Sequence, residues 1–380
     1  MQSPTIVHMI ASPLRSAPRE VMYRLVDAID RDRFQPAVAF LRHGSEEADE
    51  FGVGDMLPDF EALGIPVFCG TMERKHQVHD TARLDHFLRG IGARMIVSHL
   101  PRADMWATAM AWWGRIRNVR LLHGNWAWWH YAEHRVRHGD KAMQELDRFL
   151  LRHTDRVVSV SPGMLTALRE QQKVPADKLV WIRTGIDVER FRVAAPPFAG
   201  DRPLTFGMIT RVLESKGVFE FVAAVAAVQK HRPEVRAIVA GGGPDIEQAR
   251  IRAAELGAAI EFCGHVNDVT EVLGSIDVFV LPSWMEGTPL SLLEALAAGR
   301  LPVVTRVGGM PYVVDDGRNG IVVEPRDVQA LIAAFERIAS EPGWARGLAA
   351  GALADSGQYS LEQMARSWDA FYEDVLNSRT

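Results

Sequence analysis

The 380-residue sequence has little cysteine, little lysine and no long apolar run. Its two cysteines, Cys69 and Cys263, stand in separate strand-like segments, which argues against a disulfide framework and against a cysteine zinc site. No run of about eighteen apolar residues occurs, so we expect no transmembrane helix. The N-terminus enters an apolar strand-like segment at once, so we expect no signal peptide and a cytoplasmic protein.

The net charge and the amino-acid composition narrow the class of protein further. A net charge of -5 argues against a general nucleic-acid binder. With 47% hydrophobic and 24% charged residues the chain has the composition of an ordinary globular protein. Its length is enough for two domains that each have a full core.

Strand and helix signals alternate along the chain, which predicts an α/β protein with parallel sheets. A polar, proline-rich segment at 193–203 predicts a linker between a domain at 1–192 and a domain at 204–359, followed by a helix within 360–380. The expected strands lie near residues 5–10, 36–41, 65–68, 94–98, 118–122, 156–160 and 178–182, and near 204–209, 235–240, 258–262, 277–281, 301–304 and 320–323.

The most informative segment of the sequence joins two glutamates, Glu286 and Glu294, that are eight residues apart. An apolar strand-like run precedes it, and Thr288 and Pro289 suit the N-cap and the first position of a helix. The backbone N–H groups at such a helix start favour phosphate. Carboxylates accept hydrogen bonds from sugar and ribose hydroxyls instead. The segment therefore suits a sugar nucleotide, although a glutamate pair alone is more often a solvated helix face.

Two basic residues after another strand-like run strengthen this interpretation. Arg211 follows the strand at 204–209, and Lys216 opens the helix after it. An arginine fork and a lysine point charge together could hold a diphosphate. The alternative is a solvated lysine in a first helical turn. Only six of the 43 basic residues are lysines, however, so a chance lysine at this place is less expected.

These segments together resemble glycosyltransferase family 4, the retaining, metal-independent branch of the GT-B glycosyltransferases. The resemblance covers nearly the whole chain and is strongest from Arg211 to Gly320. It includes the family's Arg-x4-Lys and Glu-x7-Glu motifs, a glycine-rich turn at 241–244, and the later segments 307–311 and 316–320. The family pattern implies two Rossmann-like doubly wound domains that face each other across a cleft, with the C-terminal helix returning to the first domain.

The resemblance also implies roles for individual residues. Catalytic roles fall on His123, Glu286, Arg211 and Lys216. The donor-binding set is Arg211, Lys216, Gly242, Val266, Glu286, Gly287, Thr288 and Glu294. The donor is a nucleotide diphosphate sugar, and neither a cofactor nor a metal is expected because the cations already supply positive charge.

The acceptor side carries the main departures from the family pattern. His123 and His99 both stand at strand ends, where His123 matches the family histidine near the transferred sugar and His99 a position near the acceptor. A structural role is the alternative for each. The first glycine pair of the family is missing, and Arg15 or Arg19 at that turn could instead bind an anionic group, with surface solvation as the alternative. Trp126 is the third predicted acceptor contact.

Six of the ten tryptophans lie between Trp106 and Trp129, with arginines among them. This pattern suits a membrane interface or a lipid-linked acceptor. Core packing and sugar stacking are the alternatives. A peripheral contact at the inner face of the membrane is therefore one expectation for 106–129.

The sequence thus predicts a retaining glycosyltransferase that moves a sugar from a nucleotide diphosphate to a hydroxyl of a glycan or lipid-linked acceptor. Assembly of a surface polysaccharide or glycolipid is the common setting in the family. A GT-B sugar-nucleotide epimerase and a non-catalytic sugar-nucleotide-binding partner are the alternatives. The base, the sugar and the acceptor are left open.

Overall fold

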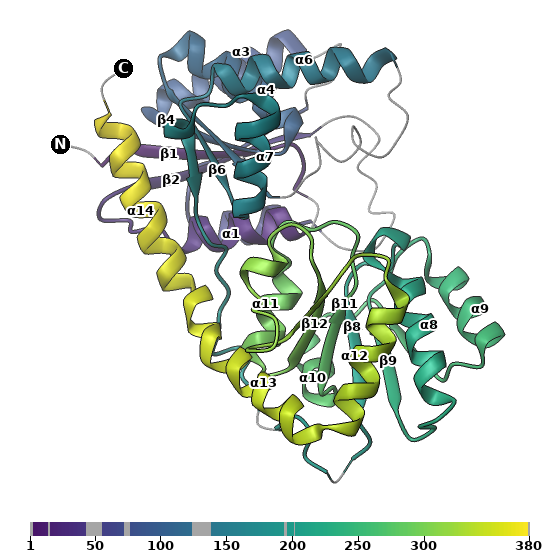
Figure 1. Ribbon diagram of the computed structural model, residues 1–380. Helices are drawn as coiled ribbons and strands as arrows, with labels where there is room; N and C mark the ends of the chain where they lie inside the picture. The colour runs from purple at the N-terminus through teal and green to yellow at the C-terminus, as the bar shows by residue number, and fades with distance from the viewer. Residues whose placement is uncertain are drawn as a thin grey trace. The chain divides into compact units, whose positions relative to one another are not determined.

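The computed structural model describes residues 3–13, 16–42, 55–71, 77–123, 138–193, 196–200 and 202–378. The chain divides into two compact units (Figure 1). The first comprises Met1–Gly185 together with Leu361–Thr380, and the second comprises Ile186–Ser360. Each unit is described separately below.

In the described part of the first unit, seven parallel strands form one sheet in the order β3-β2-β1-β4-β5-β6-β7. The strands are β1 (Thr5–Ile10), β2 (Gln35–Arg42), β3 (Val67–Thr71), β4 (Ala93–His99), β5 (Arg117–Leu122), β6 (Arg156–Ser159) and β7 (Leu179–Trp181). The helices are α1 (Ala17–Ala28), α2 (Leu57–Ala62), α3 (Gln77–Gly90), α4 (Pro101–Gly114), α6 (His138–Arg152), α7 (Pro162–Gln172) and α14 (Leu361–Asn377), with a 3-10 turn at Ala176–Lys178.

Residues along β1 alternate between the two faces of this sheet, as the pleat requires. Val7 and Met9 pack against α3 and α4, whereas Ile6 packs in a cluster formed by α1 and α14. The helix α14 contributes Met364, Trp368, Phe371, Tyr372 and Val375 to that cluster. Figure 1 shows α14 beside α1, and the two helices are in contact. The C-terminal helix therefore closes one face of the first sheet.

In the described part of the second unit, six parallel strands form a sheet in the order β10-β9-β8-β11-β12-β13. The strands are β8 (Thr205–Ile209), β9 (Arg236–Ala240), β10 (Glu261–Gly264), β11 (Val278–Leu281), β12 (Leu301–Thr305) and β13 (Ile321–Val323). The helices are α8 (Val218–Gln229), α9 (Ile246–Leu256), α10 (Val269–Ser275), α11 (Leu290–Ala297), α12 (Val328–Ser340) and α13 (Pro342–Asp355), with 3-10 turns at Glu214–Lys216, Met310–Tyr312 and Ser356–Tyr359.

The second sheet is buried on both faces, so its strands are apolar throughout rather than alternating. In β11, Val278 and Val280 pack with α8 and α12, and Phe279 and Leu281 pack with α10 and α11. Both sheets have the strand order of a doubly wound Rossmann-like fold, extended by β7 in the first. The predicted α/β architecture with two such domains is confirmed.

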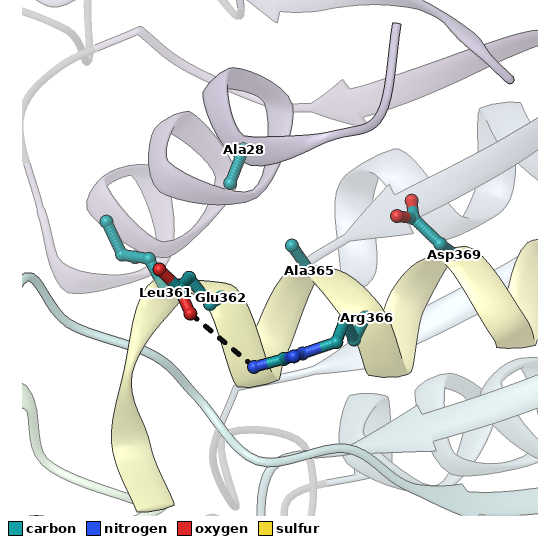
Figure 2. A pocket seen from close by; sticks show the side chains of 6 residues that line it. All are labelled: Ala28, Leu361, Glu362, Ala365, Arg366 and Asp369. Carbon is teal, nitrogen blue, oxygen red and sulfur yellow. Dashed lines mark hydrogen bonds and ion pairs between the residues drawn. The ribbon is translucent and has the colours of Figure 1, made fainter. Parts of the chain in front are cut away.

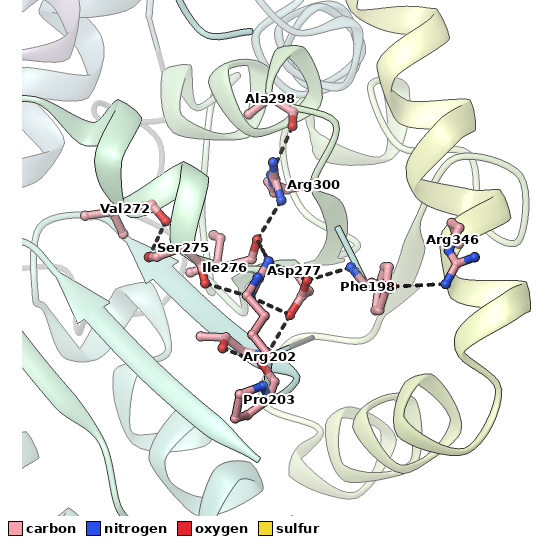
Figure 3. A network of polar contacts seen from close by, with 11 residues as sticks. Phe198, Arg202, Pro203, Val272, Ser275, Ile276, Asp277, Ala298, Arg300 and Arg346 are labelled. Carbon is pink, nitrogen blue, oxygen red and sulfur yellow. Dashed lines mark hydrogen bonds and ion pairs between the residues drawn. The ribbon is translucent and has the colours of Figure 1, made fainter. Parts of the chain in front are cut away.

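A buried carboxylate fixes the start of the second sheet (Figure 3). Asp277 accepts hydrogen bonds from the backbone N–H of Phe198 at 2.7 Å and of Thr205 at 2.9 Å, and it also pairs with Arg202 at 2.7 Å. The buried Arg300 donates to the carbonyl oxygens of Ile276 and Ala298 nearby. The carboxylate therefore ties the beginnings of β8 and β11 to the segment that precedes them.

The segment predicted as a linker, 193–203, lies inside the second unit, and the division between the units falls at Gly185 and Ile186. The reason is burial. Ile186 is fully buried in a core cluster of the second unit, and Phe198 packs in another. Proline and polar residues mark the surface turns of this segment, but its apolar residues anchor it.

Candidate functional site

The predicted donor residues gather at one edge of the second sheet. In a parallel sheet every strand ends at the same edge, and ligands bind where the strand order reverses. In this sheet the reversal lies between β8 and β11. Arg211 and Lys216 follow β8, and Glu286, Gly287 and Thr288 follow β11, so the two basic residues and the glutamate loop flank the reversal point.

Lys216 and Glu286 form the central contact of this edge. The Lys216 Nζ donates to Glu286 Oε1 at 2.6 Å. The Ser283 Oγ donates to the same oxygen at 2.9 Å. The Lys216 side chain is 24% exposed and the Glu286 side chain 9%. Among the described residues, neither Lys216 Nζ nor Glu286 Oε2 has another hydrogen-bond partner.

Two glycines let the loops approach closely enough for this contact. Gly217 has a φ of 78°, and a Cβ there would overlap the carbonyl of Pro282. Gly308 has a φ of 56°, and a Cβ there would overlap the carbonyl oxygen of Glu286. Other residues are strained at such φ values, and here they would also push the loops apart. The backbone thus requires glycine next to both partners of the ion pair.

The helix after Glu286 begins one residue later than the sequence predicts. Pro289 is the N-cap with an extended ψ of 130°, and α11 starts at Leu290, so the prediction that Thr288 caps the helix is wrong. The extended proline delays the helix, and Thr288 Oγ1 instead lies against Gly309. Glu294 is buried in the second turn of α11.

The remaining predicted donor residues lie after the neighbouring strands. Arg211 is exposed just beyond β8. Gly242 lies beyond β9, where a Cβ would come no closer than 3.9 Å to other protein atoms, so it would make ordinary contact and no clash. Val266 follows β10 and packs partly buried against one core cluster of the unit. The edge therefore combines cations, carboxylates, helix N–H groups and an uncrowded glycine.

The first unit brings three histidines and a tyrosine together in a chain. Tyr372 OH lies 3.1 Å from His8 Nε2, His8 Nδ1 lies 3.0 Å from His99 Nε2, and His99 Nδ1 lies 2.8 Å from His123 Nε2. Tyr372, His8 and His99 have no exposed surface, and His123 is half-buried. The predicted acceptor contact His99 thus lies behind His123, with both ring nitrogens engaged.

The chain is electrically neutral near pH 7. Burial lowers the pKa of His8 to about 3, and it lowers the pKa of His123 to about 3 with help from the Arg19 guanidinium. Burial also holds the pKa of His99 well below its ordinary value and raises the pKa of Tyr372 well above its own. A buried imidazole loses the hydration that stabilises its cation, so the neutral form is favoured.

Comparison with known proteins places these residues in a family. The profile of Glycosyltransferase Family 4 matches residues 19–190, and that of Glycosyl transferases group 1 matches residues 203–341. The lipopolysaccharide core biosynthesis mannosyltransferase LpsB of Rhizobium meliloti is 31% identical over 249 residues, which cover 60% of this chain and 68% of LpsB. This chain belongs to glycosyltransferase family 4.

Other relatives are similar over part of the chain. Glycogen synthase of Mycobacterium tuberculosis is 31% identical over 217 residues, which cover 54% of this chain. The matched region spans about half of that relative, at 50% of its length.

Solved structures share the fold at low sequence identity. HepE of Anabaena, solved in complex with UDP, has a TM-score of 0.82 at 18% identity and covers 97% of this chain and 100% of its own. Sucrose-phosphate synthase of Thermosynechococcus elongatus has a TM-score of 0.74 at 19% identity and covers 98% of this chain and 99% of its own. The GT-B fold of family 4 is thereby shown for this chain.

Two of the predicted acceptor contacts, Arg15 and Trp126, lie outside the described residues. Of the tryptophans in the described part of 106–129, Trp106 packs against a core cluster. Trp112 and Trp113 are instead 87% and 75% exposed on α4. Among these three described tryptophans, core packing therefore accounts for Trp106 alone.

Sequence reasoning missed Ser283, His8 and Tyr372 as site residues of this family 4 chain. Ser283 stood beside the glutamate motif, and its position between a strand and that motif was an available signal. His8 interrupts an apolar strand, and a lone polar residue on a buried strand face needs a partner. Tyr372 had no signal, because its partner His8 lies 364 residues earlier in the chain.

A groove between α1 and α14 lies apart from these residues (Figure 2). It is lined by Ala28, Leu361, Glu362, Ala365, Arg366 and Asp369. None of the predicted site residues lines it. In the described part of the chain no group of three or more histidine, cysteine or acidic side chains is arranged to hold a metal ion. Within that part, no helix is long and apolar enough to cross a membrane.

Proposed function

We propose that the chain is a retaining glycosyltransferase that transfers a sugar from a nucleotide diphosphate sugar to a hydroxyl acceptor during surface polysaccharide or glycolipid assembly. The observation that carries the proposal is the incompletely paired contact between Lys216 and Glu286 at the reversal point of the second sheet. The names of relatives support the setting, since they include a lipopolysaccharide mannosyltransferase and a putative colanic acid glycosyltransferase. Structural neighbours solved with UDP and UDP-glucose support the donor class.

The basic residues serve the leaving diphosphate in this proposal. The Lys216 ammonium group has three N–H donors. One donates a hydrogen bond to Glu286, so two remain to donate to phosphate oxygens. Arg211 adds a second cation, and the N–H groups near Gly287 and Thr288 add dipoles. Such donors stabilise the negative charge that grows as the sugar–phosphate bond breaks. Because these groups supply the positive charge, we expect transfer to need no metal, and activity should survive a chelator.

The carboxylates serve the hydroxyl groups. Glu286 Oε1 is held by Lys216 and Ser283, which leaves Oε2 to accept from hydroxyls of the donor sugar. Glu294, in the second turn of α11, accepts from the ribose hydroxyls. His123 of the first unit contacts the transferred sugar. The acceptor side includes Arg15 and Trp126, and His99 contributes through His123 because its own ring is fully buried.

A lipid surface is the proposed partner of α4. Met105, Trp112 and Trp113 are exposed apolar side chains on this helix, and the exposed Arg115 follows it. Indole rings beside arginine suit the headgroup region of an anionic bilayer. Trp112→Ala together with Trp113→Ala should reduce sedimentation with anionic vesicles and leave nucleotide binding unchanged. Equal sedimentation of the variant and the parent protein would remove the lipid surface from the proposal.

A thermal-shift titration without metal tests the donor site. Ligand that binds only the folded state raises the melting temperature by mass action. One nucleoside diphosphate among UDP, GDP and ADP should raise it clearly, and Lys216→Ala should abolish the rise. Lys230→Ala is the matched control, because Lys230 is an exposed lysine at the other end of α8. No rise with any nucleotide on folded protein would overturn the proposal.

Product analysis then separates the reaction classes. Transfer gives a glycosylated acceptor and nucleoside diphosphate. An altered free sugar formed without acceptor would indicate an epimerase, and tight nucleotide binding without turnover a non-catalytic partner.

A further inference from the structure

The hydrogen-bonded chain from Tyr372 to His123 has only two consistent arrangements of its hydrogens. A neutral imidazole carries one N–H and one bare nitrogen, and each N···N contact needs one hydrogen. The contacts His8–His99 and His99–His123 must therefore point the same way. Either every group donates toward His123, or every ring donates toward Tyr372.

The tyrosine decides between these arrangements. Tyr372 is fully buried, and among the described residues His8 is its only hydrogen-bond partner. If His8 Nε2 carried the hydrogen, the phenol hydrogen would have no acceptor, and an unmade buried hydrogen bond is costly. The phenol therefore donates to His8 Nε2. His8 then donates from Nδ1 to His99, and His99 donates from Nδ1 to His123 Nε2.

We propose that Tyr372, His8 and His99 are positioning residues that hold His123 as a neutral imidazole with Nε2 occupied and an N–H on Nδ1. The proposal rests on the proposed function, which brings a sugar hydroxyl to His123. In that reaction His123 donates a hydrogen bond from Nδ1 to the sugar and does not act as a general base. Tyr372 lies on α14, on one face of the sheet, and His123 lies at the end of β5. Through the buried chain, Tyr372 thus determines which nitrogen of His123 carries the hydrogen.

The surroundings keep the chain neutral. The Arg19 guanidinium on α1 lies near His99 and His123 and disfavours their cations, while Asp369 on α14 and burial both disfavour the phenolate of Tyr372. Among these groups only Asp369 carries negative charge, and it acts on the tyrosine. Both ends of the chain therefore stay uncharged near pH 7.

Nitrogen-15 NMR of histidine-labelled, unliganded protein tests the tautomer directly. The His123 signal is assigned by its loss in His123→Gln. We expect the wild type to carry the hydrogen on Nδ1 of His123. A hydrogen on Nε2 of His123, or a protonated ring at pH 7, would overturn the proposal. Apart from the variant that assigns the signal, this measurement needs no substitution in the hydrogen-bonded chain and no substrate.

Tyr372→Phe then removes the donor that sets the direction while keeping the ring. We expect the Nε2–H form of His123 to appear, and transfer to fall about fivefold because one oriented hydrogen bond is lost. Phe371→Leu is the control, since Phe371 is buried on the same helix outside the chain. It should leave the His123 tautomer unchanged. An unchanged tautomer in folded Tyr372→Phe would contradict the proposal.

The proposed function fails by a different measurement. If no nucleotide raises the melting temperature, the donor site is wrong, yet the tautomer of His123 is still measurable. A wild-type Nε2–H tautomer with normal nucleotide binding would refute only the role of the chain.

Discussion

Two ion pairs at opposite ends of the second sheet are built in different ways. Arg202 and Asp277 lie where β8 and β11 begin, and Asp277 is 2% exposed and accepts from two backbone N–H groups as well. Lys216 and Glu286 lie where the same strands end, and they are partly exposed with donor and acceptor capacity left over. The protein satisfies the first pair, whereas the second pair keeps hydrogen-bonding capacity that the described protein groups do not use.

The difference teaches how one sheet separates stability from chemistry. A buried charge without its partners is strongly unfavourable, so the pair at the strand starts contributes to folding. A pair with spare hydrogen-bonding capacity at a sheet's carboxyl edge is a candidate for ligand binding. The two pairs should therefore respond differently to substitution.

The largest expected effect is on folding. Asp277→Ala leaves two backbone N–H groups without their acceptor and Arg202 without its counter-charge, so the free energy of unfolding should fall by about 3–5 kcal/mol. Urea denaturation followed by tryptophan fluorescence measures this loss. Asp315→Ala is the control, because it breaks only an exposed pair with Arg318 and should cost less than about 1 kcal/mol. Equal losses of unfolding free energy in the two variants would show that the buried pair does not contribute more to folding than an exposed pair.

The next effect is on transfer alone. Lys216→Ala removes a cation from the leaving diphosphate, so kcat/KM should fall roughly 100- to 1000-fold, as when one transition-state donor is lost. The free energy of unfolding should fall less than in Asp277→Ala, because Glu286 Oε1 keeps Ser283 as a hydrogen-bond donor. Initial rates and urea denaturation are measured on the same preparation. Turnover close to that of the parent would show that the pair has no catalytic role.

A third prediction concerns pH and extends the comparison to the first sheet, whose strand ends carry neutral histidines. The folded pKa of His8 is about 3, below the unfolded value near 6.5, so the unfolded chain binds more protons between these values. Stability contributed by His8 is full above pH 6.5 and is lost as pH falls, by about 2 kcal/mol at pH 5. Denaturation at pH 7.5 and 5.0 measures this loss.

The comparison with His8→Gln isolates this histidine. Asp104 acts in the opposite sense, since burial raises its pKa to about 6 and stability from that group grows as pH falls. Asp104 is unchanged in the variant, so the difference in pH dependence belongs to His8 and to the two histidines that are linked to it. Identical pH dependences in the two proteins would show that folding does not lower the pKa of His8.

The smallest expected effect is on the rate of transfer when Glu286 is held less firmly. Ser283→Ala removes one of the two donors to Glu286 Oε1, so transfer should fall about fivefold through a less well held carboxylate. The KM for the donor should rise more than kcat falls. A loss as large as that of Lys216→Ala would mean that Ser283 contacts the substrate directly.

The features that could be predicted from the sequence are those that depend on residues close together in the chain. The strands and the loops that carry Arg211 and Glu286 depend on local patterns, so their place at the sheet edge was predictable. The hydrogen bond between Lys216 and Glu286 joins residues that are 70 positions apart in the sequence, and the spacing within each motif does not predict it. The chain through His8 and Tyr372 depends on α14 packing against β1, which no local pattern encodes.

Boundaries failed for a related reason. Pro289 is compatible both with a first helical position and with an extended cap, and the surrounding loop selects the cap. Prolines near residue 196 suggested a linker, yet burial of Phe198 and its bond to Asp277 place that segment in the second unit. Composition indicates where a chain turns, and tertiary contacts decide to which unit it belongs.

The place of α14 in the chain has a consequence for biosynthesis. Its residues complete the core of the first unit, but they follow the whole second unit in sequence. Domains fold as units while the ribosome synthesises the chain. The second unit can therefore close before the first, and until residues 361–377 are made, Ile6, Val97 and Leu121 lack the cover that α14 provides. A chain truncated after Ser360 would leave this face without α14, although it contains the whole of the second unit.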